Sequence, residues 1–447
     1  MKDIISSQKE LFVHQHPFSV EHRLNSLKRL KQAISANEEA IFEALYSDLR
    51  KSKTEAFMTE VGLVYEEINF ALKNLKKWAK PQKVKISLAQ FPAKARVISE
   101  AYGQVLIMSP WNYPFMLTIV PLIGAIAAGN VVIVKPSAYA PNIAKVMKDI
   151  IEHVFPQKEV VLFLGGRSVN EEILTYKYDY IFFTGSVEVG KVVMNKASQD
   201  LTSLTLELGG KSPCIIFGEA DLELAARRIT WGKLVNMGQT CVAPDYLIVE
   251  RKNEKVIQLI EEKFNLAKED LLKRPKIINE KHYLRLKSYL QELNIERYSD
   301  EEQIIYPTIV KTPSLDVKIM QEEIFGPILP VIIVDNLVEA KLLINSRPKP
   351  LAMYVYSDEK KVVDYLLTHT SSGSFTVNDN LMQLASSHLP FGGVGESGMG
   401  SYHGHQSFIT FSHQKSVLFK SKKFDLKFRY KNDEAAYKMA KKIIKTK

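Results

Sequence analysis

Apolar residues recur along this chain with two different spacings, and these spacings separate predicted helices from predicted strands. Residues 22–50 and 55–80 have apolar side chains three and four positions apart among charged ones, which is typical of amphipathic surface helices. Pro81 ends the second of these helices. Short apolar runs, typical of buried strands, then alternate with helical segments. The predicted strands are 105–108, 131–134, 160–163 and 180–183, and the predicted helices are 115–128, 144–154 and 190–197.

A second region with the same alternation follows Gly209. Strands that alternate with helices indicate parallel sheets with helices on both faces, so the predicted fold class is α/β. Residues 82–104 have an extended pattern, and residues 390–404 are rich in glycine and proline. The latter predicts an ordered loop with tight turns or close backbone contacts. In this second region the predicted strands are 214–217, 246–249, 328–334, 353–356 and 374–377, and the predicted helices are 222–237 and 255–266.

The composition is that of an ordinary globular protein, with 447 residues, 46% hydrophobic and 25% charged. This length predicts about two to four domains. The formal net charge of +10 first suggests a nucleic-acid partner. However, residues 420–447 carry eleven Lys/Arg and three Asp/Glu, which leaves only +2 for the rest of the chain. Because the body has no basic stripe interleaved with aromatic residues, we predict no nucleic-acid partner.

Two cysteines are too few for a disulfide framework, and the N-terminus has no apolar run typical of a secretory signal. The longest apolar stretch, 115–129, is shorter than the about 20 residues of a membrane span and contains Pro121. We therefore predict a cytoplasmic protein.

The charged tail has its own pattern. One helical face carries apolar residues and the rest carries lysines, which predicts a basic amphipathic helix able to lie weakly on an anionic membrane surface. A frayed, solvated terminus is the alternative. The apolar residues are Ala436, Met439, Ala440, Ile443 and Ile444, and the basic ones are Lys438, Lys441, Lys442 and Lys445.

Three side chains are candidates for covalent and acid–base chemistry. Cys241 has small or polar neighbours that suit a cleft, although a buried structural cysteine, as we expect for Cys214, is the alternative. Glu207 lies between two leucines before two glycines, where apolar surroundings would raise its pKa toward that of a general base. A solvent-facing carboxylate is the alternative. Asn112 precedes a buried helix and can stabilise an oxyanion or simply act as a turn residue or cap.

Other positions suggest a nucleotide site. Lys135 and Ser137 lie at the carboxyl end of a predicted strand, where ligands of open α/β sheets bind, although a solvated surface lysine is an equal alternative. Residues 182–190 predict a strand, a glycine turn and a helix start that can face a phosphate. Their Gly185 and Gly190 have Gly-x-x-x-x-Gly spacing, which is not the dinucleotide fingerprint. The segment Gln-Glu-Glu-Ile-Phe-Gly-Pro at 321–327 says little alone.

Taken together and in this order, these segments resemble the aldehyde dehydrogenase superfamily from about residue 5 to about residue 420. Within it, Gly-Gln-Thr-Cys-Val-Ala-Pro-Asp-Tyr, Glu-Glu-Ile-Phe-Gly-Pro and Leu-Pro-Phe-Gly-Gly-Val-Gly-Glu-Ser-Gly-Met-Gly-Ser-Tyr-His-Gly resemble the class 3 branch, which includes fatty and aromatic aldehyde dehydrogenases. The resemblance implies oxidation of a medium- to long-chain aliphatic or aromatic aldehyde to the carboxylic acid. Class 3 relatives are typically homodimers, which makes a homodimer the expected state.

The resemblance also implies roles for these residues. Cys241 would be the nucleophile, the Asn112 amide and the Cys241 N–H would hold the oxyanion, and Glu207 would activate water to hydrolyse a thioester, with no metal involved. NAD or NADP would be the cofactor, and Glu323 would bind its nicotinamide ribose beside Phe325. The adenosine ribose would lie against Lys135 and Ser137, and the pyrophosphate against Gly185, Ser186 and Gly190.

Two departures from the family pattern matter. Family members commonly have a glutamate at the position of Ala138, and a carboxylate there would repel a 2′-phosphate. Its absence predicts that NADP is tolerated or preferred. Residues 290–303 lack the family's glycine-rich hairpin and are expected to form a shortened surface loop.

The resemblance finally implies an aldehyde dehydrogenase-like fold with a Rossmann-type NAD(P)-binding domain. We expect that domain at residues 1–80 and 98–206, the catalytic α/β domain at 207–390, a bridging and oligomerisation element at 81–97 and 391–420, and a basic tail at 421–447. An acylating dehydrogenase that passes the thioester to coenzyme A is disfavoured because such enzymes generally do not use the general-base glutamate. A non-catalytic member is disfavoured because Cys241, Glu207 and Asn112 are all present.

Overall fold

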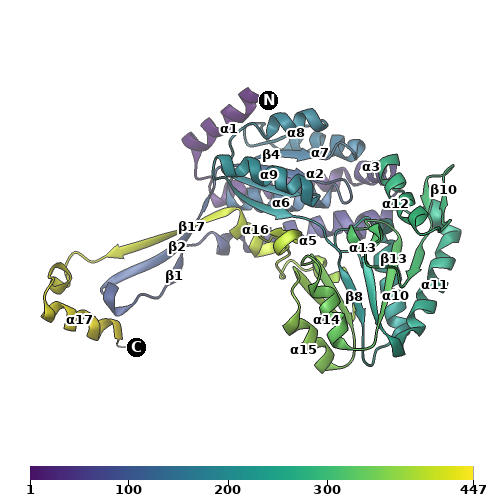
Figure 1. Cartoon of the computed structure of the whole chain (residues 1–447). Coiled ribbons are helices and arrows are strands. Elements are labelled where there is room, and N and C mark those ends of the chain that lie inside the picture. The colour runs from purple at the N-terminus through teal and green to yellow at the C-terminus, as the bar shows by residue number, and fades with distance from the viewer. Residues whose placement is uncertain (446–447) are drawn as a thin grey trace.

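Two six-stranded sheets form the body of the protein, as seen in a computed structural model that describes residues 1–445 (Figure 1). In the first sheet the strand order is β16-β7-β6-β3-β4-β5, and all pairs are parallel except the antiparallel β16–β7 pair. These strands are β3 (Gln104–Ser109), β4 (Val131–Pro136), β5 (Val160–Leu162), β6 (Tyr180–Thr184), β7 (Ser203–Glu207) and β16 (Gly398–Met399).

Helices cover both faces of the first sheet, because its strands are apolar on both sides. Val105 and Ile107 pack in one core with α2, α5, α6 and α7, whereas Leu106 and Met108 pack in another with α1, α8 and α9. The helices before and within this sheet are α1 (Lys2–Gln15), α2 (Val20–Ala36), α3 (Glu38–Leu49), α4 (Lys53–Ala56), the π-helical η1 (Phe57–Val61), α5 (Gly62–Trp78), α6 (Met116–Ala128), α7 (Pro141–Val154), α8 (Arg167–Ile173) and α9 (Val187–Gln199).

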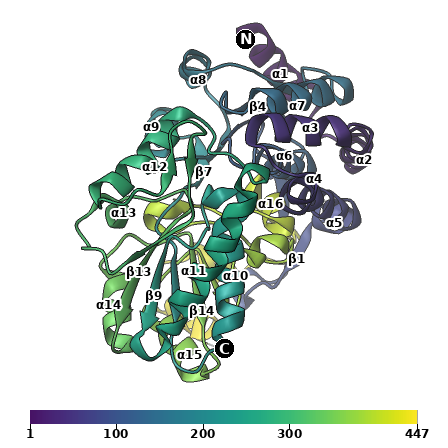
Figure 2. The ribbon, with the colours of Figure 1, turned by 90° about the vertical axis from the view of Figure 1, so that its right-hand side faces the viewer.

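The second sheet is entirely parallel, with strand order β12-β13-β9-β8-β14-β15 (Figure 2). Its strands are β8 (Pro213–Ile216), β9 (Tyr246–Glu250), β12 (Thr308–Lys311), β13 (Ile328–Val334), β14 (Ala352–Tyr356) and β15 (Ser374–Val377). Its α-helices are α10 (Leu222–Leu234), α11 (Lys255–Ala267), α12 (Glu280–Glu292), α13 (Lys318–Gln321), α14 (Leu337–Asn345) and α15 (Lys360–His369). The predicted α/β class is therefore confirmed in both sheets.

A long three-stranded antiparallel arm projects from the body (Figure 1). Helix α16 (Gly404–Thr410) leads into its last strand. That strand pairs with β2 over nine residues, from Ser412 opposite Ala101 to Lys420 opposite Ala93. The strands are β1 (Gln82–Val84), β2 (Ala93–Ala101) and β17 (Ser412–Lys420), with the short 3-10 helix η2 (Leu88–Gln90) between the first two.

The basic tail folds at the far end of this arm. After η8 (Lys427–Tyr430), helix α17 (Glu434–Lys445) packs near η2 (Figure 1). The predicted helix is confirmed over residues 434–445, where most residues are exposed to solvent; residues 446–447 lie outside the described part. Ala436 is buried, whereas Met439 and Ile444 are exposed. Among residues 1–445, no helix has the length and apolar character needed to cross a membrane.

Two expectations from the sequence were wrong. Residues 290–303 do not form a plain loop, because β10 (Tyr298–Ser299) pairs antiparallel with β11 (Ile304–Ile305). Asp300 fixes this hairpin to α12 by accepting hydrogen bonds from Tyr283 and Lys287. The helix predicted over 222–237 ends at Leu234, because Asn236 and Met237 have left-handed backbone angles.

Candidate active site

Cys241 lies in the loop between η3 (Val235–Gly238) and β9. It is partly exposed between buried neighbours, whereas Cys214 is fully buried in β8, as expected for a structural cysteine. Burial raises the pKa of the Cys241 thiol, and the nearby carboxylates of Glu323 and Glu207 raise it further. Backbone N–H groups of Cys241 and Val242 oppose this rise. The residue is thus partly exposed, and burial together with two nearby acids disfavours ionisation of its thiol.

Glu207 is the last residue of β7 and is 2% exposed. Neither of its carboxylate oxygens has a hydrogen-bond partner within the described part of the chain. Burial holds the pKa of this carboxyl well above its usual range. The solvent-facing alternative is therefore wrong, and the arrangement is that of a buried acid able to exchange a proton with a neighbour.

Glu323 lies against the turn that follows Glu207. The N–H of Gly210 donates to its carboxylate, and a Cβ atom at Gly209 would overlap Glu323 Oε2, so the glycine pair makes room for this acid. Burial, followed by the charge of Asp245, raises the pKa of Glu323 to about 8. The structure thus brings Cys241, Glu207 and Glu323 together from three separate segments.

Two lysines lie near these acids, and the sequence did not indicate a role for either of them. Lys211 donates to the Asp245 carboxylate and to the carbonyls of Ile319 and Glu322, which fixes the segment before Glu323. Lys233 is fully buried in α10, and its ammonium has no hydrogen-bond partner among residues 1–445. Burial lowers the pKa of Lys233 to about 8. The Gly-Gly-Lys sequence offered a signal for Lys211, but Lys233 looked like an ordinary exposed helical lysine.

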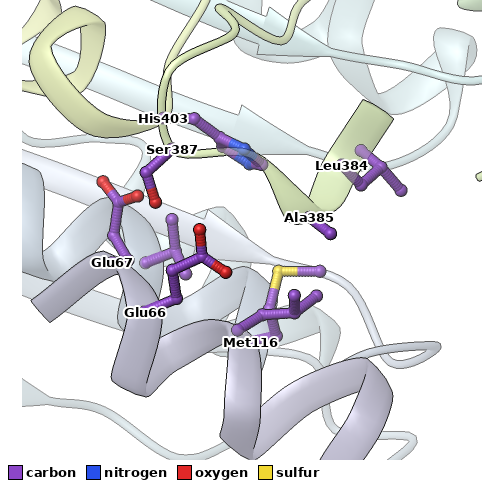
Figure 3. A pocket seen from close by; sticks show the side chains of 9 residues that line it. Glu66, Glu67, Met116, Leu384, Ala385, Ser387 and His403 are labelled. Carbon is purple, nitrogen blue, oxygen red and sulfur yellow. The ribbon is translucent and has the colours of Figure 1, made fainter. Parts of the chain in front are cut away.

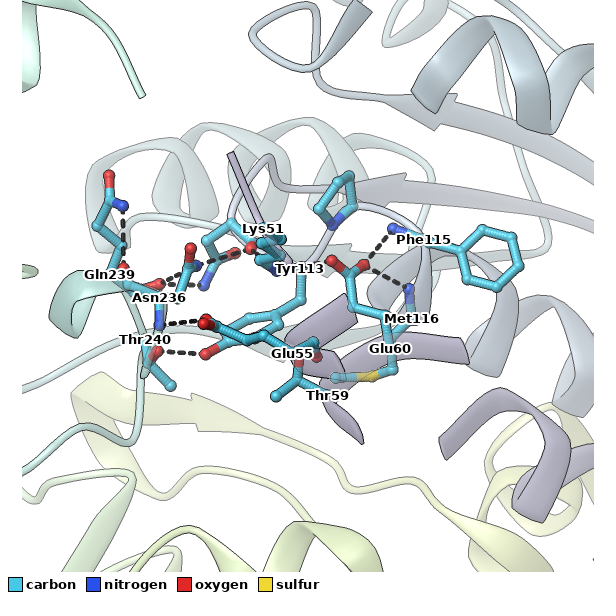
Figure 4. Close-up of polar contacts among 12 residues, drawn as sticks. Lys51, Glu55, Thr59, Glu60, Tyr113, Phe115, Met116, Asn236, Gln239 and Thr240 are labelled. Atoms are coloured by element: carbon cyan, nitrogen blue, oxygen red, sulfur yellow. Dashed lines mark hydrogen bonds and ion pairs between the residues drawn. The ribbon is translucent and has the colours of Figure 1, made fainter. Parts of the chain in front are cut away.

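Asn112 is 2% exposed, in the loop between β3 and α6. Its side-chain Nδ2 donates to the backbone carbonyl of Gln239 at 3.1 Å, two residues before Cys241. The next residue, Tyr113, bonds through its hydroxyl to Thr240 Oγ1 at 2.6 Å (Figure 4). A side-chain amide has two N–H groups, and the bond to Gln239 uses only one. Asn112 therefore lies beside the cysteine loop with a donor to spare.

The predicted nucleotide residues share the carboxyl edge of the first sheet. Lys135 ends β4 and is 2% exposed, so the solvated-lysine alternative is wrong. Its Nζ donates to the Pro136 carbonyl at 2.7 Å, and burial lowers its pKa to about 8. Ser137 is half-buried and Ala138 is exposed. An amine with two remaining N–H groups at such an edge suits ribose or phosphate oxygens.

The glycine turn after β6 begins helix α9. Ser186 is its N-cap and accepts from the Val189 N–H at 3.4 Å, and the Gly185 N–H donates to the Glu207 carbonyl at 3.0 Å. A Cβ atom at Gly185 would lie 2.5 Å from the Phe183 ring, and one at Gly190 would lie 2.7 Å from Leu208. Close packing thus accounts for both glycines, and the helix start provides N–H groups suited to a phosphate.

Phe325 adopts a left-handed backbone with φ of 49° and packs edge-on against Trp111, with ring centroids 5.5 Å apart. The buried Oε1 of Glu323, two residues earlier, has no hydrogen-bond partner in the described residues. An aromatic ring can pack against a planar cofactor ring, and a carboxylate oxygen without a hydrogen-bond partner can accept from the hydroxyl groups of an attached ribose. This donor and acceptor set is compatible with a dinucleotide along the edge.

A small cavity lies beside the start of α6, between α5, α6 and η6 (Met382–Ala385) (Figure 3). Its walls combine apolar side chains with the polar side chains of Glu66, Glu67, Ser387 and His403. Met116, only four residues after Asn112, is part of its wall. Glu67 faces it and accepts from the Gly404 N–H at 2.7 Å, and burial raises the pKa of Glu67 to about 7. The main apolar wall residues are Leu63, Met116, Val120, Leu384 and Ala385.

The chain is similar to known proteins over almost its whole length. Residues 1–417 match the model of the aldehyde dehydrogenase family. The 4,4'-diaponeurosporen-aldehyde dehydrogenase of Staphylococcus aureus is 44% identical over 93% of this chain and 93% of its own. Aldehyde dehydrogenase family 3 member A2 of Macaca fascicularis is 42% identical over 95% of this chain and 89% of its own, which confirms the class 3 resemblance.

Two further matches bear on fold and cofactor. The rat protein named aldehyde dehydrogenase, dimeric NADP-preferring, is 40% identical over 94% of this chain and 95% of its own. A solved structure titled substrate bound state of Staphylococcus aureus AldH has a TM-score of 0.95 and 40% identity, and covers 99% of both chains. The predicted fold is therefore confirmed.

Proposed function

Because the chain belongs to the aldehyde dehydrogenase family and is an NAD(P)-dependent enzyme that oxidises aldehydes to acids, we propose that Cys241 carries the reaction as a covalent intermediate. The observation that carries this proposal is the convergence of a partly exposed thiol, a buried unpaired carboxyl and a spare amide donor in one place. A covalent nucleophile divides a difficult oxidation into two easier steps.

In the first step the Cys241 sulfur, having released its proton to solvent, forms a bond to the aldehyde carbon. Negative charge moves to the aldehyde oxygen, which accepts hydrogen bonds from the Asn112 amide and the Cys241 N–H. NAD(P), when bound, supplies the acceptor for the hydride. Loss of that hydride from the tetrahedral adduct leaves a thioester on Cys241.

In the second step Glu207 accepts a proton from a water molecule that attacks the thioester carbon. The carbon–sulfur bond then breaks and the acid leaves. The departing thiolate takes up the proton held by Glu207, which restores both the thiol and the carboxylate. Glu207 suits this role because it is buried and neither of its oxygens is committed to another described residue. Burial that keeps its pKa high makes it a stronger base once it has lost its proton.

For the cofactor, Lys135 and Ser137 would hold the adenosine ribose, Gly185, Ser186 and Gly190 the pyrophosphate, and Glu323 and Phe325 the nicotinamide end. The adenosine and pyrophosphate would thus lie against the domain at residues 1–80 and 98–206. The nicotinamide end would reach the domain at 207–390, which supplies Cys241 and Glu207. Preference for NADP is supported by Ala138, which is exposed beside Lys135 and carries no charge that would oppose a 2′-phosphate.

The substrate class we propose is a medium- or long-chain aliphatic, or an aromatic, aldehyde. The apolar side chains of Leu63, Met116 and Val120 beside the start of α6 support this class, because Met116 follows Asn112 by only four residues. The Staphylococcus aureus relative, named for a diaponeurosporen-aldehyde, also supports an extended apolar substrate.

We also propose a cytoplasmic homodimer. The arm formed by β1, β2 and β17 is available to join two copies, because residues 81–97 and 412–420 project from the body (Figure 1). Its exposed apolar residues, which include Phe91 and Phe419, support an interface there. Weak contact of α17 with an anionic membrane surface is a second proposal, supported by the exposed Met439 and Ile444 among lysines.

The mechanism is tested with aldehydes of increasing chain length on the wild type, Cys241→Ala and Cys214→Ala, with reduced nicotinamide as the readout. We expect Cys241→Ala to abolish turnover with every aldehyde, and Cys214→Ala, the matched control, to retain it. Normal turnover by Cys241→Ala would contradict the covalent mechanism. An efficiency that falls as the chain lengthens would contradict the proposed substrate class alone.

A further inference from the structure

The side chain of Lys51 is completely buried. Its side chain and that of Glu60 are both 0% exposed, and Lys51 Nζ lies 2.6 Å from Glu60 Oε1. Removing two charges from water costs several kcal/mol per ion, and their mutual attraction often does not recover this cost. The Lys51–Glu60 pair therefore need not stabilise the fold, and its role is better inferred from the other groups that it contacts.

Those contacts all converge on the loop that carries Asn112. Lys51 Nζ donates to the backbone carbonyl of Asn112 at 2.9 Å and lies 4.0 Å from the centre of the Tyr113 ring. Glu60 Oε2 accepts from the N–H groups of Phe115 at 2.8 Å and Met116 at 3.2 Å (Figure 4). One ion pair thus holds both ends of the segment 112–116.

The other side of this loop is tied to the cysteine loop. Asn236 Nδ2 donates to the Asn112 carbonyl at 2.8 Å and to the Gln239 carbonyl at 3.1 Å. The Asn112 side chain donates to that same Gln239 carbonyl. The backbone carbonyl of Asn112 is therefore clamped between Lys51 and Asn236, while its amide lies beside the loop that ends at Cys241.

We propose that Lys51, neutralised by Glu60, is a positioning residue of the reaction that fixes the Asn112 carbonyl and thereby aims the Asn112 amide at the oxyanion. This rests on the proposed role of Asn112. Lys51 itself contacts neither substrate nor cofactor. Oxyanion donors work only when they are held in place before the charge develops, so loosening the backbone of the donor weakens the transition state more than the ground state.

Three variants test this proposal. Lys51→Met/Glu60→Gln removes both charges and retains an acceptor for the Phe115 and Met116 N–H groups. It is compared with Lys51→Arg and with Asn112→Ala. Removal of one oxyanion donor costs about a hundredfold or more in kcat. For the double variant we expect kcat to fall by about tenfold to a hundredfold, while KM for the cofactor and the melting temperature change little. Lys51→Arg keeps a charged donor and should recover part of the rate.

A mutant cycle separates positioning from a merely structural role. Adding Asn112→Ala to the double variant should slow it to the level of Asn112→Ala alone, because both changes disable the same donor. Lys53→Met is the matched control and should leave kcat unchanged. Lys53 lies two positions from Lys51 but is exposed, and it pairs with Glu39.

Additive losses in this cycle, or wild-type kcat in the double variant beside an impaired Asn112→Ala, would overturn the positioning role and leave the proposed function intact. Wild-type kcat in Asn112→Ala would instead overturn the oxyanion assignment and the positioning role with it. If the double variant does not fold, Lys51→Arg decides, because a guanidinium cannot reproduce the single-point geometry of the ammonium. Its kcat should fall at least threefold at unchanged melting temperature, and an unchanged kcat would overturn the proposal.

Discussion

Gly398 lies directly opposite Glu207 in the antiparallel register of β16 and β7. Its φ is 143°, and a Cβ atom there would overlap the carbonyl oxygen of Leu206. The next residue after Glu207, Leu208, donates its N–H to the Ser397 carbonyl at 3.1 Å. The glycine-rich segment therefore fixes the end of the strand that presents the proposed base.

We expect Gly398→Ala to displace β16 from β7 and to destabilise the protein by about 1–3 kcal/mol, the usual cost of a strained backbone position. Turnover should fall as well, because the end of β7 loses its support. Denaturant unfolding and kcat measure the two effects. Gly166→Ala is the matched control, since nothing lies within 4 Å of a Cβ atom at Gly166. Equal stability of the two variants would contradict this account of the strand pairing.

Glu207→Gln should separate the two chemical steps. The thioester still forms, so a rapid burst of about one reduced nicotinamide per site should remain, whereas steady turnover should fall about 10²- to 10⁴-fold with loss of the base. Stopped-flow absorbance measures both phases. Glu43→Gln on the exposed surface of α3 is the control and should behave as the wild type. A steady rate that equals that of the wild type would remove Glu207 from the second step.

The sequence alone predicted most strands of both sheets, because a buried parallel strand needs a short apolar run and few other segments have one. It did not predict β12 and β16, which have only four and two residues. It also indicated Cys241, Glu207 and Asn112, which lie at strand ends and loops with distinctive neighbours. It did not indicate Lys51, whose role depends on a carbonyl 61 residues away. Buried polar residues of this kind look like surface residues in sequence, because only the tertiary fold brings their partners to them.

The break at Asn236 shows the same limit. Helical periodicity predicts a helix through Met237, but the Asn236 N–H donates instead to Glu55 Oε1 at 2.7 Å. This partner comes from an N-terminal helix nearly two hundred positions earlier, and periodicity within a single helix has no information about it.

Glu67 should make stability depend on pH. Burial raises its pKa from 4.5 to about 7, so the folded state binds this proton more tightly than the unfolded state. The stability associated with that proton is complete below the unfolded pKa and is lost as the pH rises through about 7. Between pH 5 and pH 8 the free energy of unfolding should therefore fall in both proteins, and the fall should be smaller in Glu67→Gln by on the order of 2 kcal/mol.

Urea unfolding of the two proteins at both pH values measures this difference. Glu43→Gln again serves as the control and should follow the wild type. A Glu67→Gln variant with the same loss of stability as the wild type would show that Glu67 is ionised in the folded protein throughout this range.

Cofactor choice should respond to charge at position 138. Ala138 is exposed next to the proposed ribose site of Lys135, so Ala138→Glu would place a carboxylate where a 2′-phosphate is expected. Like-charge repulsion should lower kcat/KM for NADP by about tenfold or more and leave NAD less affected. Ala138→Gln has the same shape without the charge and should retain the wild-type ratio. A strong NAD preference in the wild type, or an equal effect of both variants, would contradict the electrostatic argument.

The tail offers the last prediction. Helix α17 exposes Tyr437, Met439 and Ile444 together with several lysines, while Ala436 packs inward. Each lysine near an anionic surface contributes about 1 kcal/mol, so the attraction should be modest and sensitive to salt. The full chain should float with vesicles that contain phosphatidylserine at low salt, and sink with neutral vesicles or at high salt. A chain without residues 431–447 should lose this binding while its turnover of a short, soluble aldehyde stays unchanged. Replacing Lys438, Lys441 and Lys445 by glutamate should abolish flotation with the helix still present, whereas equal flotation of the truncated chain would place the contact elsewhere.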